Sequence, residues 1–166
     1  MSLKINKETE LQKKLIDTNA VLGGFGFKLQ DKYVKGKPDL WLKLPSGTMI
    51  FAEVKVIRNA RYTITPEFSL LQLNYMERLT EANVPVIGLI FTKSPEGYVN
   101  FKISSYMELK KLHEKFNKIK YHISHFKRAH NLEEIIQALE EFFAGSTPQI
   151  SRMKDEVVTT FFSAVI

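Results

Sequence analysis

Cysteine is absent from the 166-residue chain, and long hydrophobic runs are absent as well. A chain without cysteine has no disulfide, zinc–thiolate site, thiol nucleophile or iron–sulfur cluster. No stretch approaches the roughly 18 consecutive apolar residues of a membrane-spanning helix, and the first residues lack the apolar core of a signal peptide. We therefore expect a soluble protein with no membrane partner that stays in the cytoplasm, or in that of a host cell if the source is viral.

The composition is typical of a globular protein, with 44% hydrophobic and 25% charged residues. The length fits one compact domain. We expect this domain to cover residues 1–145, with a core over about 7–91 and a basic helical region over about 105–145. Residues 146–166 then form a C-terminal tail. Its end, 157–166, has strand-like composition, and we expect it to pack on the body of the domain, to form a contact between subunits, or to stay flexible.

The positive charge of the chain is concentrated in one segment. The formal net charge is +6, and residues 110–130 contain seven lysines and arginines and one glutamate. The rest of the chain is therefore balanced in charge. We call residues 110–130 the basic segment. Such a segment favours binding to the phosphates of a nucleic acid. The alternative is a basic helix face and loop that only contact solvent.

Hydrophobic periodicity and turn signals predict a layered α/β arrangement in which antiparallel hairpins are joined by a crossover helix. We expect helices over about 7–19, capped by Asn6, from Ser69 to about 82, over 106–117, and over 132–143, capped by Asn131. The expected strands cover 25–34, 39–44, 48–57, 84–91 and 98–103, the last of them at the edge of the sheet.

One predicted strand combines ionisable residues with an apolar interior. Alternation places Glu53 and Lys55 side by side on the same face, together with Phe51 and Ile57. Pairing of the two charges with each other is a sufficient structural explanation. A third charge, Asp39, begins the neighbouring strand of the hairpin, and two close carboxylates repel unless a cation or a proton lies between them. Oxygen ligands suit Mg²⁺ or Mn²⁺, and a nearby lysine can orient or deprotonate a water.

These residues also form a recognisable signature. Pro38-Asp39, followed after thirteen residues by Glu53-Val54-Lys55, resembles the PD-(D/E)XK motif of the restriction-endonuclease-like nuclease superfamily. The run from Ser69 to Gln72 and the strand after it resemble the serine/glutamine helix of virus-type replication-repair nucleases and archaeal Holliday-junction resolvases. The resemblance implies an α/β fold with an αβββαβ core, in which a central mixed sheet is flanked by helices, plus C-terminal helices.

The resemblance also implies roles for individual residues. Asp39 and Glu53 are expected to ligate one or two divalent cations, Mg²⁺ with Mn²⁺ as a substitute, together with the backbone carbonyl of Val54. Lys55 is expected to activate or position the attacking water. Gln72 is expected to orient either that water or Lys55.

The first helix is similar to the acidic helix of these enzymes, with Glu8 followed four residues later by Gln12. As the catalytic and metal-binding acid we prefer Glu8 to Glu10, because helical geometry places Glu8 closer to the buried stripe that contains Leu11. A favourable charge near a helix N-terminus would explain either glutamate equally well.

The expected function is that of a Mg²⁺-dependent DNA endonuclease that hydrolyses phosphodiester bonds, with a junction, flap or nick as substrate in replication, repair or recombination. One site cuts one strand, so cleavage of two strands requires a homodimer. A non-catalytic DNA-binding module on the same scaffold is the alternative. We interpret Trp41 as a packing residue rather than a base-stacking platform. The residues expected to contact DNA are Arg58, Arg61, Lys118, Lys120, Lys127 and Arg128.

Overall fold

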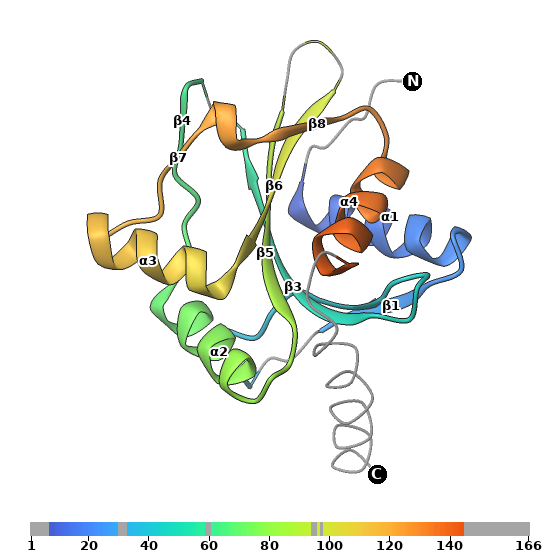
Figure 1. Ribbon diagram of the computed structural model, residues 1–166, viewed down its shortest axis with the longest axis horizontal. Coiled ribbons are helices and arrows are strands. Elements are labelled where there is room, and N and C mark those ends of the chain that lie inside the picture. Colours follow the sequence, from blue (N-terminus) through green and yellow to red (C-terminus); the bar gives the residue numbers. More distant parts are fainter. Residues whose placement is uncertain (1–6, 30–32, 59–60, 94–95, 97, 145–166) are drawn as a thin grey trace.

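The structure is a computed structural model that describes residues 7–29, 33–58, 61–93, 96 and 98–144 (Figure 1). The predicted cap Asn6 and the predicted tail over 146–166 lie outside these residues. No helix within the described part of the chain is long and apolar enough to cross a membrane.

A six-stranded mixed sheet forms the centre of the molecule. Its strand order is β1-β2-β3-β5-β6-β8, and only the central pair β3 and β5 is parallel. A separate two-stranded sheet pairs β4 with β7. The strands are β1 (Phe25–Lys28), β2 (Leu40–Lys43), β3 (Met49–Ile57), β4 (Thr63–Ile64), β5 (Val86–Lys93), β6 (Val99–Ser105), β7 (Tyr121–His122) and β8 (Lys127–Ala129).

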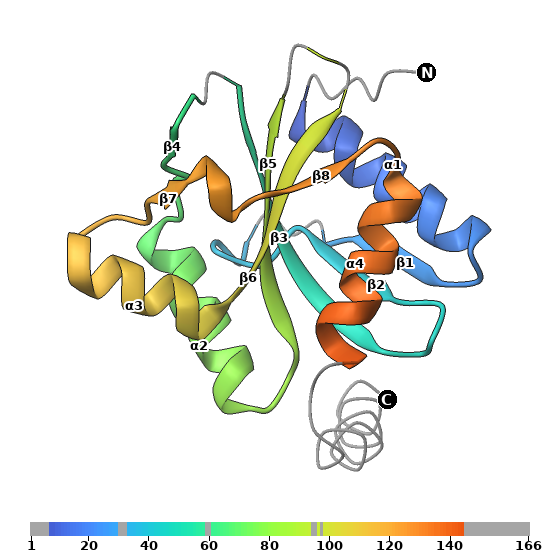
Figure 2. The same ribbon diagram turned by 45° about the horizontal axis from the view of Figure 1, so that its top comes forward.

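Helices cover both faces of this sheet (Figure 2). Helices α1 (Glu8–Val21) and α4 (Leu132–Ala144) lie on one face, and α2 (Leu70–Glu81) and α3 (Tyr106–Phe116) lie on the other. A short 3-10 helix, Ile123–His125, follows β7. The order α1-β1-β2-β3-α2-β5, with β4 as a small addition, confirms the expected αβββαβ core and its flanking helices.

Two hydrophobic cores follow from the alternation of side chains along the central strands. Ala52 and Val54 pack with α1 and α4, whereas Phe51 and Ile57 pack with α2 and α3. Strand β5 is buried over its first seven residues, as predicted from its nearly continuous apolar run. The charged residues of β3 therefore face the side of the sheet that carries α2, which confirms the predicted alternation.

The structure corrects four local predictions. Helix α1 has Lys7 as its N-cap, with no side-chain capping bond, instead of the predicted Asn6. Strand β1 ends at Lys28, and Tyr33 and Val34 lie in a bend instead of the predicted strand. Strand β2 begins at Leu40, one residue after the predicted start.

The fourth correction concerns the edge of the sheet. Strand β6 is not an edge strand, because β8 pairs with it on the outer side. This edge strand lies in the basic segment, where helix and loop were expected. A three-residue strand with one buried residue, Ala129, gives almost no periodic signal.

Candidate active site

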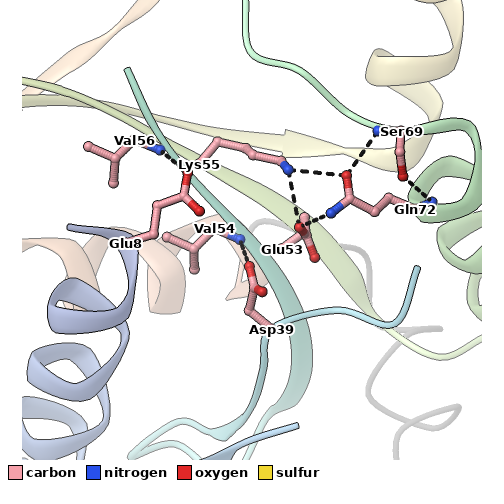
Figure 3. Close-up of polar contacts among 8 residues, drawn as sticks. All are labelled: Glu8, Asp39, Glu53, Val54, Lys55, Val56, Ser69 and Gln72. Carbon is pink, nitrogen blue, oxygen red and sulfur yellow. Dashed lines mark hydrogen bonds and ion pairs between the residues drawn. The ribbon is translucent and has the colours of Figure 1, made fainter. Parts of the chain in front are cut away.

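The candidate site lies where β3 extends beyond its neighbour β2. The pairing of β2 with β3 ends at Leu40 and Ala52, so the later N–H groups on that edge of β3 need other acceptors. Asp39 Oδ2 accepts from the Val54 N–H at 2.8 Å, and Glu8 Oε1 accepts from the Val56 N–H at 3.2 Å (Figure 3). Carboxylates from α1 and from the residue before β2 thus replace a strand partner at this edge.

Glu53 and Lys55 project from the same face of β3 toward the N-terminus of α2 (Figure 3). Glu53 is only 2% exposed. Its Oε1 accepts from Gln72 Nε2 at 2.5 Å and lies 3.4 Å from Lys55 Nζ. Lys55 Nζ also donates to Gln72 Oε1 at 3.1 Å and lies 5.3 Å from the centre of the Phe68 ring. The ammonium is therefore held by three neighbours rather than by its ion pair alone.

Gln72 is itself held by the capping box of α2. The Ser69 Oγ accepts from the Gln72 backbone N–H at 3.1 Å, and the Ser69 backbone N–H donates to Gln72 Oε1 at 2.9 Å. A capping box satisfies two N–H groups that a helix start would otherwise leave unpaired. The same amide group thus starts a helix and bridges Glu53 to Lys55.

Burial makes ionisation of the two inner carboxyl groups unfavourable. Desolvation, followed by the negative charge of Asp39, raises the pKa of Glu53 to about 8, although Lys55 opposes the shift. Desolvation also raises the pKa of Asp39, against the lowering effects of the Val54 N–H and Lys55. Glu53 Oε2 is buried without a hydrogen-bond partner. A buried, unpaired carboxylate oxygen beside a second carboxylate requires a proton or a cation.

The carboxylate oxygens of Asp39 and Glu53 suit a hard divalent cation. Mg²⁺ is usually held by one or two carboxylates and keeps several waters, so Asp39 and Glu53 suffice as its protein side-chain ligands. Within the described residues, no group of three or more His, Cys, Asp or Glu side chains is arranged to hold a metal ion. Val54 contributes its N–H to Asp39, and the role of its carbonyl as a ligand stays a prediction.

The two glutamates of α1 differ in their contacts. Glu10 pairs with Lys14 at 3.0 Å on the same helix, whereas Glu8 reaches β3 and its charge raises the pKa of both Asp39 and Glu53. The prediction that Glu8 lies closer to the buried side of the helix was wrong, because Glu8 is exposed and Glu10 is half-buried. The contact with the edge of β3, rather than burial, places Glu8 beside the other acids.

The predicted DNA-contacting residues are divided between two regions. Arg58 and Arg61 are exposed and lie between β3 and β4. The pairing of β4 with β7, extended by the bond from the Ile123 N–H to the Tyr62 carbonyl at 2.8 Å, brings the basic segment beside that chain.

The remaining four predicted DNA contacts are all exposed. Lys118 and Lys120 directly precede β7, but Lys127 and Arg128 lie on β8 at the far edge of the sheet. The Arg128 guanidinium lies 4.3 Å from the centre of the Tyr98 ring. The nucleic-acid role of all six residues stays a prediction.

Sequence reasoning did not find Phe68, whose ring supports Lys55, or the exposed Phe25 and Phe27 of β1. Phe68 lies in an irregular segment before α2, where no periodic pattern exists to predict a tertiary contact. For the two phenylalanines of β1, alternation with Gly26 was an available signal of a shared face.

Comparisons with known proteins gave matches among solved structures alone. No family model and no curated protein matches the chain. The chain is similar to a structure described as a VRR_NUC domain, with 27% identity, a TM-score of 0.40, and coverage of 68% of this chain and 99% of that one. It is also similar to Hjc, a Holliday junction resolvase from Archaeoglobus fulgidus, with 14% identity, a TM-score of 0.49, and coverage of 71% and 90%.

Proposed function

We propose that this protein is a metal-dependent DNA endonuclease whose site consists of Asp39, Glu53, Lys55 and Gln72, with Glu8 beside them. The observation that carries the proposal is the buried, unpartnered Oε2 of Glu53 next to a second carboxylate and a lysine. Such an arrangement destabilises the ionised form of the metal-free site. A bound divalent cation would relieve both the repulsion and the missing partner.

Each residue has a distinct part in this proposal. Asp39 and Glu53 would hold the cation, which supplies a Lewis acid and lowers the pKa of a bound water. Lys55 would orient the attacking water and stabilise the negative charge that develops on the phosphate. Gln72 fixes both Glu53 and Lys55 through its two amide atoms, and therefore acts as a positioning residue.

The proposed substrate is DNA with a junction, flap or nick, processed during replication, repair or recombination. The basic segment would contribute affinity for the backbone that is independent of sequence. Two strands would be cut by a homodimer, because one site cuts one strand at a time. The support for these finer statements is the resemblance of the sequence and the concentration of charge in residues 110–130.

A cleavage assay tests the proposal. Labelled duplex, flap, single-stranded and four-way-junction DNA are incubated with the protein and Mg²⁺, Mn²⁺ or EDTA. We expect metal-dependent cutting that is lost in Asp39→Ala, Glu53→Ala and Lys55→Ala. Glu10→Ala is the matched control, because Glu10 pairs within its own helix and should cut normally.

Cutting that survives the three substitutions would contradict the proposed site. Absence of cutting by the wild type, together with salt-sensitive DNA binding, would instead support a non-catalytic DNA-binding module on this scaffold.

A further inference from the structure

An exposed group of aromatic side chains lies on β1 and β2. Phe25 and Phe27 are 58% and 46% exposed, and both rings contact the almost buried Trp41. The ring centres of Phe27 and Trp41 are 5.2 Å apart, and those of Phe25 and Trp41 are 6.1 Å apart. We call Phe25, Phe27 and Trp41 the aromatic shelf. Trp41 is therefore a packing residue, as predicted, and it packs against the exposed rings of Phe25 and Phe27.

The aromatic shelf shares a face of the sheet with the candidate active site. Phe27 pairs directly with Trp41, and Trp41 pairs with Phe51. Directly paired residues project to the same side of a sheet, and Phe51 and Glu53 are two residues apart on β3. The exposed rings therefore lie on the same face of the sheet as Glu53, which follows Phe51 by about 7 Å along β3.

Within the described residues, the helices leave the rings of Phe25 and Phe27 exposed. Helix α1 contacts β1 and β2 from the opposite side, and α2 and α3 contact β5. Strand β1 is also an edge strand of the sheet. Exposed apolar side chains at an edge promote aggregation unless a partner covers them. Lys43 lies directly across from Phe25 and is exposed, which adds a positive charge beside the rings.

We propose that the aromatic shelf stacks with unpaired bases of the DNA substrate. This inference rests on the proposed function and specifies its substrate as DNA with a single-stranded segment. Aromatic rings bind nucleobases through their flat faces, and these faces are accessible in unpaired DNA but covered by neighbouring bases in a duplex. The lysine beside the rings suits the phosphates that accompany those bases. A lysine beside the rings suits a polyanion better than it suits the apolar contact of a second copy of the chain.

The test compares two oligonucleotides that differ only in their bases. Binding of a 12-nucleotide deoxythymidine strand and of an abasic strand of equal length is measured by anisotropy in EDTA, where no metal-dependent cutting occurs. We expect the full-length protein to bind the base-bearing strand at least about fivefold more tightly, from stacking of one or more bases. The same strand should quench the emission of Trp41, the chain's single tryptophan.

The double variant Phe25→Ala/Phe27→Ala should lose this preference while it retains binding of the abasic strand. Phe142→Ala is the matched control, because Phe142 is 41% exposed on α4, at the opposite face. Circular dichroism shows whether both variants are folded, and the single variant Phe27→Leu, which keeps an apolar side chain without a ring, should also lose the preference.

Equal binding of the two strands by the wild type would overturn the inference, as would a preference that survives in the double variant. A double variant that changes from dimer to monomer, with its base preference intact, would assign the aromatic shelf to self-association. Failure of the nuclease proposal can be told apart from failure of this inference. A wild type that prefers base-bearing strands but cuts no DNA with metal would support base stacking by the aromatic shelf and contradict the nuclease proposal.

Discussion

At the scale of single residues, the site depends on a carboxyl group that the fold prevents from ionising freely. Glu53 has an ion pair and an amide donor on one oxygen, but nothing on the other. Its pairing with Lys55 was a sufficient explanation from sequence, yet the pairing does not compensate for burial, since the pKa of Glu53 remains near 8. A group in this state is a common feature of functional sites.

The raised pKa of Glu53 predicts how stability depends on pH. The pKa is about 8 in the folded protein against an ordinary value of 4.5, so the folded state binds a proton that the unfolded state releases between these values. The free energy of unfolding of the metal-free wild type should therefore fall as pH rises from 4.5 to about 8. The fall amounts to a few kcal/mol, because each pKa unit is worth about 1.4 kcal/mol. Urea unfolding in EDTA measures it.

Glu53→Gln is the control for this prediction. The variant cannot ionise at this position, so its stability should vary less over the same range and should exceed that of the wild type at pH 9. A wild type that becomes more stable between pH 5 and 8, with no difference from Glu53→Gln, would contradict the assignment.

Gln72 offers a second prediction at this scale. Gln72→Glu keeps an acceptor for the Ser69 N–H, but it replaces the amide that donates to Glu53 by a further carboxylate, in addition to Asp39. We expect kcat for cleavage to fall by about tenfold to a hundredfold, as for residues that orient metal ligands, with little change in KM. The pH dependence of kcat should move to higher pH. Unchanged kcat and an unchanged pH profile would show that Gln72 serves only the helix.

At the scale of secondary-structure elements, the start of α2 and the polar network around Glu53 and Lys55 share the side chain of Gln72. Ser69→Ala removes the Oγ acceptor of the capping box and should lower the free energy of unfolding by about 1 kcal/mol. Ser69→Thr keeps a hydroxyl acceptor and should recover most of this loss. If the box also positions Gln72, Ser69→Ala should reduce kcat at a temperature where it is fully folded, and Ser69→Thr should restore it. Loss of stability without any change in kcat would separate the two roles.

The elements also show how far the sequence could predict this structure. The bounds of β3, α3 and α4 were predicted to within one residue at each end, because their pattern of buried side chains is periodic, whereas the strand predicted for β5 begins and ends two residues too early. The structure confirms for the same reason that Glu53 and Lys55 share one face of β3. The short strand β8 and the Phe68 contact depend on tertiary pairing and leave no local pattern.

The exposure of Phe25 and Phe27 was beyond prediction for a related reason. Hydrophobic residues in a strand are expected to be buried. Only the position of β1 at the end of the sheet, without a described helix over that face, leaves these two rings exposed.

At the scale of the whole molecule, part of the basic segment lies beside the chain that leaves β3. The pairing of β4 with β7 joins the basic segment to the chain that follows β3. Lysines there should act on DNA through phosphates, whereas the aromatic shelf should act through bases.

This division predicts different salt dependences. Lys120→Ala should weaken binding of every DNA sequence and reduce the slope of log affinity against log salt by about one. Lys13→Ala, an exposed lysine of α1 outside the basic segment, should leave the slope unchanged. A slope that is the same in both variants would remove Lys120 from the DNA interface. Titrations at several salt concentrations provide the measurement.

The central claim is that Glu53 serves metal-dependent hydrolysis rather than stability, and single-turnover cleavage by Glu53→Gln at pH 8 tests it most directly. The substitution is nearly isosteric and should not destabilise the fold, so unfolding curves of the same preparation exclude misfolding as a cause. We predict that Glu53→Gln cuts DNA at least about a hundredfold more slowly than the wild type while it is as stable or more so. A stable variant that cuts DNA at the wild-type rate would contradict it.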